Sequence, residues 1–277
     1  MIPRAALVQW GAKVPWPTDE DIEQDLIMSR LMIDIANDAL LGPELVMRGG
    51  TCLHKIHLPE PLRYSEDLDY NRRTNSGIGP YVNAIEAVAK NIGLRMKKFK
   101  RGGQMATVVL DCDSTGGLRL IRIKVETNVR ETTPCYPIIT RPHEVKSSWW
   151  SGRADVPTFE LAELMGTKLR ALYQRSRGRD LFDLWHVLTE TKVDDDRLVA
   201  AFHHYMGTEA FGFPQLRENL RDKLADTAFS NDLSDLVRAT PTGYDLTKAA
   251  DLFMERIGSR LKNAPPIEEI NNGGWRA

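Results

Sequence analysis

Apolar residues recur at helical spacing near the start of the chain, and the pattern then changes to the alternation typical of strands. Thr18 precedes three acidic residues, which is a favourable cap and first turn, so we expect a helix from there to Gly42. The alternating segments predict strands at Glu44–Arg48, Leu94–Lys100, Ala106–Asp111 and Leu118–Asn128, and further helices are predicted at Thr51–His57 and Tyr81–Ile92.

The residue pattern in the second half of the chain predicts helices. Prolines at 134, 137 and 142 predict a linker. Helices are then expected at Thr158–Arg175, Asp180–Leu188, Asp195–Met206, Pro214–Phe229, Leu233–Arg238 and Tyr244–Leu261. The sequence therefore predicts an α/β (α+β) protein with one domain over residues 1–145, a helical domain over 146–262 and a flexible tail over 263–277.

Composition narrows the class of protein without identifying it. The formal net charge of −1 gives no overall indication of a nucleic-acid partner. No apolar run reaches the length of a membrane span, so we expect no membrane partner. Three widely spaced cysteines argue against a disulfide framework or a cysteine zinc site, and a reduced, cytoplasmic compartment is the expected location.

The most informative segment contains Asp67 and Asp69. In a strand these two carboxylates project from one face, while Leu68 points toward a core. Two adjacent carboxylates repel each other, so a cation is expected between them, and Mg²⁺ is the best candidate, with Mn²⁺ as an alternative. Glu126 lies on the polar face of the strand ending at Asn128, either as a third carboxylate of this site or as a solvent-facing strand end. A solvated acidic loop remains the alternative for the whole segment.

Lys168 lies within the apolar stripe of its predicted helix, between Met165 and Leu172. An ammonium group among apolar neighbours requires an anion or an escape to solvent. The sequence leaves both open: Lys168 either meets a triphosphate in a cleft or extends to the surface.

A basic turn follows this helix, with Arg175, Arg177 and Arg179 within five positions. Three arginines suit phosphates or an RNA backbone, and a solvated turn is the alternative. Asp180 and Asp183 share the next helical face. Asp180 either belongs to the site or caps its helix, and Asp183 either belongs to the site or pairs with Arg179.

Gly49 and Gly50 form a turn between a strand and a short helix that Thr51 is expected to cap. Backbone N–H groups at such a turn bind phosphate well, although the segment lacks the pattern of a P-loop. Ser65, two residues before Asp67, offers a hydroxyl near a bound phosphate. Gly50, Thr51 and Ser65 are therefore candidate nucleotide-binding residues.

Five segments in order along the chain carry a resemblance to a known family. They are Arg48–Lys55, Arg63–Tyr70, Ile123–Glu126, Glu160–Leu172 and Gly178–Trp185. As an ordered set they resemble the AbiEii/AbiGii-type nucleotidyltransferase toxins, the family that includes the mycobacterial MenT toxins.

The resemblance implies a polymerase-β-like nucleotidyltransferase domain followed by a helical domain. It implies Mg²⁺ held by Asp67 and Asp69, with or without Glu126, and phosphates bound by Lys168. It also implies that Asp180 or Asp183 completes the site, and that a cognate antitoxin binds the protein. In part of the family the antitoxin acts by phosphorylating a serine that corresponds to Ser65.

We therefore expect a toxin that transfers NMP from an NTP to RNA, with the tRNA 3′ end as the expected acceptor, and so blocks translation. Two metal ions suit this reaction, because they stabilise the attacking and leaving oxygens together. Nucleotidyl or phosphoryl transfer to a protein or small molecule is the alternative among enzymes. A non-catalytic nucleotide- or RNA-binding module is the alternative outside them.

Overall fold

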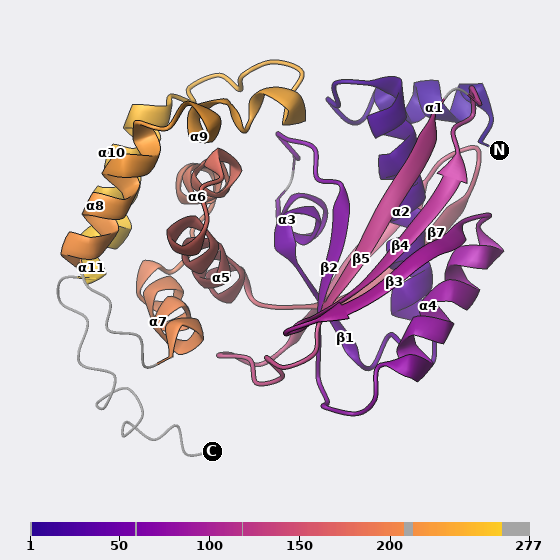
Figure 1. Ribbon diagram of the computed structural model, residues 1–277. Helices are drawn as coiled ribbons and strands as arrows, with labels where there is room; N and C mark the ends of the chain where they lie inside the picture. The colour runs from indigo at the N-terminus through magenta and orange to yellow at the C-terminus, as the bar shows by residue number, and fades with distance from the viewer. Residues whose placement is uncertain (1, 59, 118, 208–212, 262–277) are drawn as a thin grey trace. The chain divides into compact units, whose positions relative to one another are not determined.

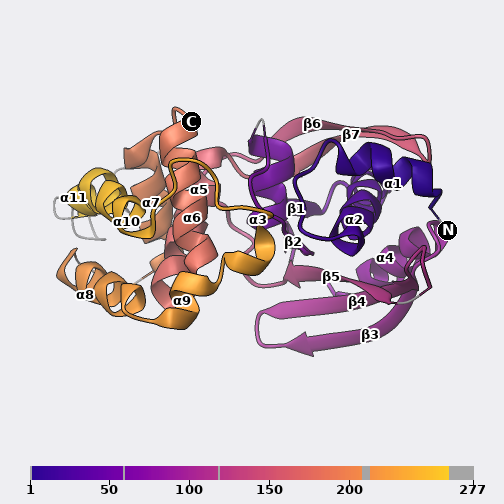
Figure 2. The ribbon, with the colours of Figure 1, turned by 90° about the horizontal axis from the view of Figure 1, so that it is seen from above.

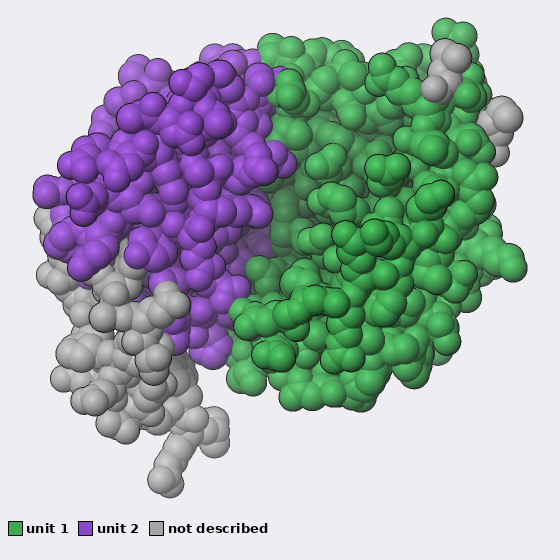
Figure 3. Space-filling view, in the orientation of Figure 1, with its two compact units in different colours: residues 1–160, 235–239 green, residues 161–234, 240–277 purple. Residues whose placement is uncertain are grey.

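The structure is a computed structural model that describes residues 2–58, 60–117, 119–207 and 213–261. The chain divides into two compact units, which Figure 3 shows in different colours. Unit 1 comprises residues 1–160 and 235–239, and unit 2 comprises residues 161–234 and 240–277. The expected α/β class with a helical second part is confirmed, and the tail expected at 263–277 lies outside the described residues.

Unit 1 is built on a mixed seven-stranded sheet with the strand order β3-β4-β5-β2-β1-β7-β6. Its strands are β1 (Leu45–Arg48), β2 (Asp67–Arg72), β3 (Arg95–Gly102), β4 (Met105–Asp113), β5 (Leu120–Asn128), β6 (Ile139–Lys146) and β7 (Ser151–Thr158). Strand β2 runs parallel to β5 and antiparallel to β1, while β3, β4 and β5 form an antiparallel meander. The central position of β2 between β5 and β1 places the Asp67–Asp69 segment in the middle of the sheet.

The helices of unit 1 are α1 (Arg4–Gly11), α2 (Asp19–Asn37), α3 (Gly49–Cys52) and α4 (Gly79–Asn91). A π-helical turn, Leu53–His57, continues α3. Helices α2 and α4 cover one face of the sheet (Figures 1 and 2), where the apolar residues of the strands are buried. The cap predicted at Thr18 is confirmed as a capping box: its hydroxyl accepts a hydrogen bond from the Asp21 backbone at 3.1 Å, and Asp21 accepts one from the Thr18 backbone at 3.1 Å.

The predicted proline linker is wrong. Pro134 and Pro137 precede β6, but Pro142 lies within it, and β6 pairs antiparallel with β7 from Ile139↔Thr158 to Lys146↔Ser151, while β7 joins β1 in the sheet. The expected boundary after residue 145 therefore falls inside β6. Pro142 is compatible with this strand because β6 is an edge strand, where a missing N–H costs no ladder hydrogen bond.

Unit 2 is helical, as predicted. Its helices are α5 (Leu161–Gln174), α6 (Gly178–Glu190), α7 (Asp195–Met206), α8 (Phe213–Leu224), α9 (Thr227–Asn231), α10 (Leu246–Phe253) and α11 (Ser259–Leu261), with a π-helical turn, Met254–Gly258, between the last two. Helix α5 packs against α6 and α7. The single helix predicted over 214–229 is two helices, because Asp226 caps α9 through its side chain, and the helix predicted at 233–238 is only a short 3₁₀ turn, Ser234–Leu236. No helix in the described part of the chain is long and apolar enough to cross a membrane.

Candidate active site

The carboxylates of Asp67 and Asp69 project from the same face of β2, as the alternation predicted. Both residues are half-buried, whereas Leu68 and Tyr70 are buried on the opposite face. The alternative of a solvated acidic loop is wrong, because the pair belongs to a central strand with neighbours on both sides. This arrangement presents two oxygen-rich groups side by side on a rigid element.

Strand β5 adds two charged residues to this face. The register of β2 against β5 places Glu126 beside Asp69 and Lys124 beside Asp67. The Lys124 ammonium lies 3.4 Å from each carboxylate oxygen of Asp67. The structure thus brings Glu126 next to the aspartates, and it adds a lysine that belongs to the same polar row of β5 and that the sequence interpretation did not select.

The surroundings of Asp67 disfavour the ionised form of its carboxyl group. Burial raises the pKa of its carboxyl to about 6; Lys124 opposes the rise, while Asp69, Glu66 and Glu126 add to it. A cation bound here would relieve this repulsion. Oxygen donors of this kind suit Mg²⁺, which is commonly held by one or two carboxylates while water and phosphate complete its shell. Among the described residues no three acidic, histidine or cysteine side chains form a ready-made metal cage, so Asp67 and Asp69 offer a partial ligand set of this type.

The glycine pair lies directly against these carboxylates. Gly49 has φ = 80°, and a Cβ there would overlap the carboxylate of Asp69. A Cβ on Gly50 would lie 2.8 Å from the Ser65 hydroxyl and 2.7 Å from a guanidinium nitrogen of Arg63. The two glycines therefore allow the start of α3, the serine hydroxyl and the Asp69 carboxylate to crowd together.

Thr51 is hydrogen-bonded to β2, the strand that carries Asp67 and Asp69. It is buried, and its hydroxyl donates a 2.6 Å hydrogen bond to the backbone carbonyl of Asp67. The predicted cap is wrong, because α3 already begins at Gly49 and Arg48 occupies the N-cap position without a side-chain cap. The observed contact assigns the Thr51 side chain a positioning role toward β2.

In unit 2 Lys168 is buried against two fully buried aspartates. Its ammonium lies 2.7 Å from a carboxylate oxygen of Asp183 and 3.4 Å from one of Asp180. The Arg175 guanidinium donates two hydrogen bonds, of 2.7 and 2.9 Å, to the carboxylate of Asp180. The alternative in which Lys168 extends to the surface is wrong, because these anions within the protein stabilise it. The four side chains form a compact cluster with two positive and two negative charges.

The remaining arginines of the basic turn are tied to a residue far along the chain. Arg179 donates two side-chain hydrogen bonds, of 2.8 and 2.9 Å, to Asp232, and Arg177 donates another of 3.2 Å. Although burial acts in the other direction, these hydrogen bonds hold the pKa of Asp232 at about 2. Within unit 2 these two arginines fix the entrance to α6 to the segment that follows α9.

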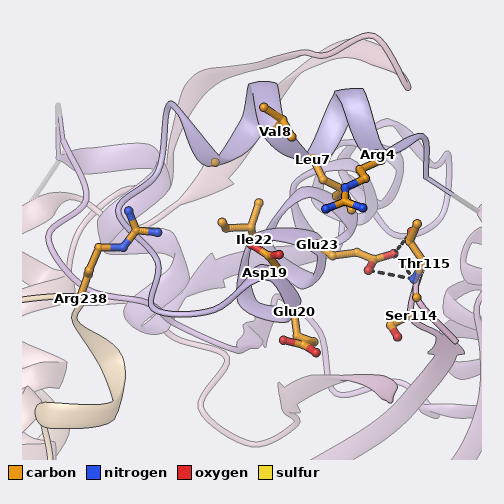
Figure 4. A pocket seen from close by; sticks show the side chains of 12 residues that line it. Arg4, Leu7, Val8, Asp19, Glu20, Ile22, Glu23, Ser114, Thr115 and Arg238 are labelled. Atoms are coloured by element: carbon orange, nitrogen blue, oxygen red, sulfur yellow. Dashed lines mark hydrogen bonds between the residues drawn. The ribbon is translucent and has the colours of Figure 1, made fainter. Parts of the chain in front are cut away.

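A separate pocket of about 550 Å³ lies in unit 1 beside α1, the start of α2 and the turn after β4 (Figure 4). Arg4 and Arg238 line it, together with Glu23, which accepts hydrogen bonds from Thr115. None of the predicted site residues lines it. The pocket is therefore distinct from the carboxylate face of β2.

The structure gathers the predicted residues into two groups, one in each unit. Unit 1 unites Gly50, Thr51, Ser65, Asp67, Asp69 and Glu126, and unit 2 unites Lys168, Arg175, Asp180 and Asp183. The sequence interpretation missed Lys124, although the alternation of β5 carried its signal. It also missed Lys223, whose ammonium donates to the carbonyls of Leu172 and Tyr173 at the end of α5; no local pattern marks such a contact.

Comparisons with known proteins identify the family and the fold of the chain. A family model described as "Nucleotidyl transferase AbiEii toxin, Type IV TA system" matches residues 30–256. The fold is similar to that of MenT4, a nucleotidyltransferase toxin from Mycobacterium tuberculosis, with a TM-score of 0.66, 16% identity and 98% of each chain covered. It is also similar to JHP933 from Helicobacter pylori, with a TM-score of 0.56, 14% identity and coverage of 92% of this chain and 96% of that one. No curated protein matches the chain.

The family model spans most of the chain and includes both groups of site residues. The expected α/β class with a helical second part is found in a fold similar to that of a solved nucleotidyltransferase toxin. This chain belongs to the AbiEii family of nucleotidyltransferase toxins of toxin–antitoxin systems.

Proposed function

We propose that this nucleotidyltransferase transfers NMP from an NTP to the 3′ end of RNA, with tRNA as the acceptor, and thereby blocks translation. The observation that carries the proposal is the pair Asp67 and Asp69, half-buried side by side on β2 against the Gly49–Gly50 turn. NTP and tRNA are both cytoplasmic, so we place the reaction there, with a cognate antitoxin as the controlling partner.

In this reaction the RNA 3′-hydroxyl oxygen forms a bond to the α-phosphorus of the NTP. The bond from that phosphorus to the β-bridging oxygen breaks, the electron pair leaves with pyrophosphate, and the hydroxyl proton is released. A divalent metal, Mg²⁺ or Mn²⁺, held by Asp67 and Asp69 would supply charge neutralisation for the attacking and leaving oxygens. Glu126 lies beside Asp69 in the strand register and would support this ligand set.

The other residues of unit 1 bind and orient the nucleotide in this scheme. The backbone at Gly50 and the Ser65 hydroxyl lie close together, and we assign them to the phosphates. Thr51 fixes the backbone of Asp67, so it acts as a positioning residue. A phosphoryl group on Ser65 would place negative charge beside the carboxylates, which gives an antitoxin that modifies this serine a direct route to inhibition.

We assign Lys168 and Arg175 to the binding of nucleotide phosphate within unit 2. Their charges are compensated by Asp183 and Asp180 before a nucleotide binds. A phosphate would therefore share the two cations with the aspartates, and Asp180 and Asp183 hold the cations in position.

A nucleotide-incorporation assay tests this function. The purified chain is incubated with tRNA, Mg²⁺ and each labelled NTP in turn, and RNA 3′ ends are sequenced. We expect label in RNA, and we expect Asp69→Ala to lower incorporation by at least about 10²-fold, the order found for one lost electrostatic group. The control is Glu86→Gln, which removes an exposed carboxylate from α4 on the opposite face of the sheet.

Two other outcomes would contradict the proposal. Label in a protein or small molecule, with none in RNA, would support a different acceptor. Growth inhibition that persists with a folded Asp69→Ala protein would support a non-catalytic binding module.

A further inference from the structure

The edge strand β3 carries an unusual concentration of positive charge. Five of its eight residues are basic, namely Arg95, Lys97, Lys98, Lys100 and Arg101, and none is acidic. The whole chain, in contrast, has 37 basic and 38 acidic residues. Figure 2 shows β3 as the outermost strand beside β4. A local basic strip on a nearly neutral protein indicates an anionic partner at this place.

The strand register shows which of these cations share a face with the aspartates. Lys100 lies opposite Thr107 of β4, Thr107 opposite Glu126 of β5, and Glu126 beside Asp69 of β2. Residues directly opposite each other in a sheet project from the same face. Lys100 therefore belongs to the same cross-strand row as Asp69.

A second row runs parallel to the first. Lys98 lies opposite Val109, Val109 opposite Lys124, and Lys124 beside Asp67. Burial agrees with this assignment, because Thr107 and Val109 are half-exposed whereas the residue between them, Val108, is buried. Each row crosses three strand spacings, which is about 14 Å between the lysine and its aspartate.

Both lysines are available to a ligand. Lys98 and Lys100 are exposed, and within the described part of the chain neither makes an ion pair. Arg95 differs, because it pairs with Asp111 and Asp113. Arg101 differs in direction, because it lies opposite the buried Ala106 and so projects from the helix-covered face.

We propose that Lys98 and Lys100 form an RNA-backbone docking surface that leads to the aspartates of β2. The inference rests on the proposed transfer to RNA and deepens it. An RNA 3′ end that reaches Asp67 and Asp69 brings phosphates toward two carboxylates, and cations on the same face offset that repulsion. The distance of about 14 Å places the lysines beside nucleotides that precede the reacting end. Lysines also protect edge strands from aggregation, but that role does not depend on which face they project from.

Binding of fluorescently labelled tRNA to the full-length chain, without NTP and at several salt concentrations, tests the surface. The test variant is Lys98→Ala with Lys100→Ala. The matched control is Lys90→Ala with Arg101→Ala, which removes two exposed charges from α4 and from the other face of β3. Each lysine that contacts phosphate contributes about 0.7–0.9 to the slope of log affinity against log salt. We expect the double variant to lose about 1.4–1.8 of that slope and about 5–8-fold in affinity per lysine at 0.1 M salt.

The same variants give a catalytic readout. In the test variant the KM for tRNA rises while the KM for NTP and the kcat at saturating tRNA stay unchanged, and Lys98→Arg with Lys100→Arg restores tRNA binding. If the test and control pairs change tRNA binding equally, or if neither changes it, the proposed docking surface is wrong. A test pair that weakens only the complex with a co-expressed antitoxin would make this a protein interface and would also overturn it.

The two proposals fail in distinguishable ways. If the wild type labels RNA and the lysines do not matter, the docking surface is wrong and the transfer stands. If the wild type binds tRNA through these lysines but labels no RNA, the transfer is wrong and the surface stands.

Discussion

Replacing Asp67 with asparagine should stabilise unit 1 while it abolishes nucleotide transfer. The pKa of Asp67 is raised from 3.8 to about 6, chiefly by burial. At neutral pH the folded protein therefore holds an ionised carboxylate that its surroundings disfavour. At about 1.4 kcal/mol per pH unit, the rise corresponds to about 3 kcal/mol. Because the side chain is 29% exposed, solvent reduces this figure, and we expect a gain of about 1–3 kcal/mol.

The sign of the pH dependence follows from the same shift. Above pH 6 the folded wild type carries the disfavoured charge, so the advantage of Asp67→Asn is fully present. It declines as pH falls from 6 to 3.8 and is lost below 3.8, where the carboxyl is protonated in both the folded and unfolded states. Lys124 loses its partner in the variant, but its side chain is 41% exposed and remains hydrated, so the offsetting cost is small.

Chemical denaturation without metal at pH 8 and pH 4 measures the effect, and thermal unfolding should show a rise of roughly 2–4 °C per kcal/mol. Glu86→Gln, which removes an exposed carboxylate on α4, should leave stability unchanged. Addition of Mg²⁺ should stabilise the wild type more than Asp67→Asn, because bound metal favours the folded state. A wild type that is at least as stable as Asp67→Asn at pH 8, or a difference that does not shrink at pH 4, would refute the reasoning.

Four further substitutions probe Gly49, Lys168 and Lys223. Gly49→Ala should lower activity at least tenfold in an incorporation assay, because its φ of 80° and the adjacent Asp69 carboxylate leave no room for a Cβ; normal activity would contradict this packing. Lys168→Met should destabilise unit 2 by about 3–5 kcal/mol in denaturant, since it removes the ammonium that lies 2.7 Å from the fully buried Asp183 carboxylate, while Asp180 keeps Arg175; Lys168→Arg should be milder. Burial lowers the pKa of Lys223 from 10.5 to about 8. Between these two values the unfolded state binds more protons, so the unfolding free energy of the wild type, measured relative to Lys223→Met, should rise from pH 8 to pH 10.5. A difference that does not change with pH would exclude the shift.

Local patterns predicted the parts of this protein that depend on neighbours in the sequence. The period of two in β2 put Asp67 and Asp69 on one face, and the same period put Lys124 and Glu126 on the polar face of β5. The helix cap at Thr18 depends on a residue only three positions away, so it too was predictable from the sequence. These features were predictable because backbone geometry alone decides which way successive side chains point.

The linker prediction failed because local signals do not distinguish an edge strand from a loop. The prolines near 142 are unfavourable inside a sheet, yet β6 tolerates Pro142 because the outer side of that strand pairs with nothing in the described sheet. Which strand becomes an edge depends on the pairing of the entire sheet. That information is spread over β1, β6 and β7 and is absent from any one segment.

The alternation of the sequence thus determined the carboxylate face by itself, and the periodicity of α5 marked Lys168 as an ammonium in need of an anion. Only the tertiary structure decided what that anion is within unit 2, since the approach of α6 to α5 brings Asp180 and Asp183 to it. It likewise joined Arg179 to Asp232, 53 residues away. The physical reason is that period fixes the direction of a side chain, whereas its partner depends on how distant elements pack to bury their apolar surfaces.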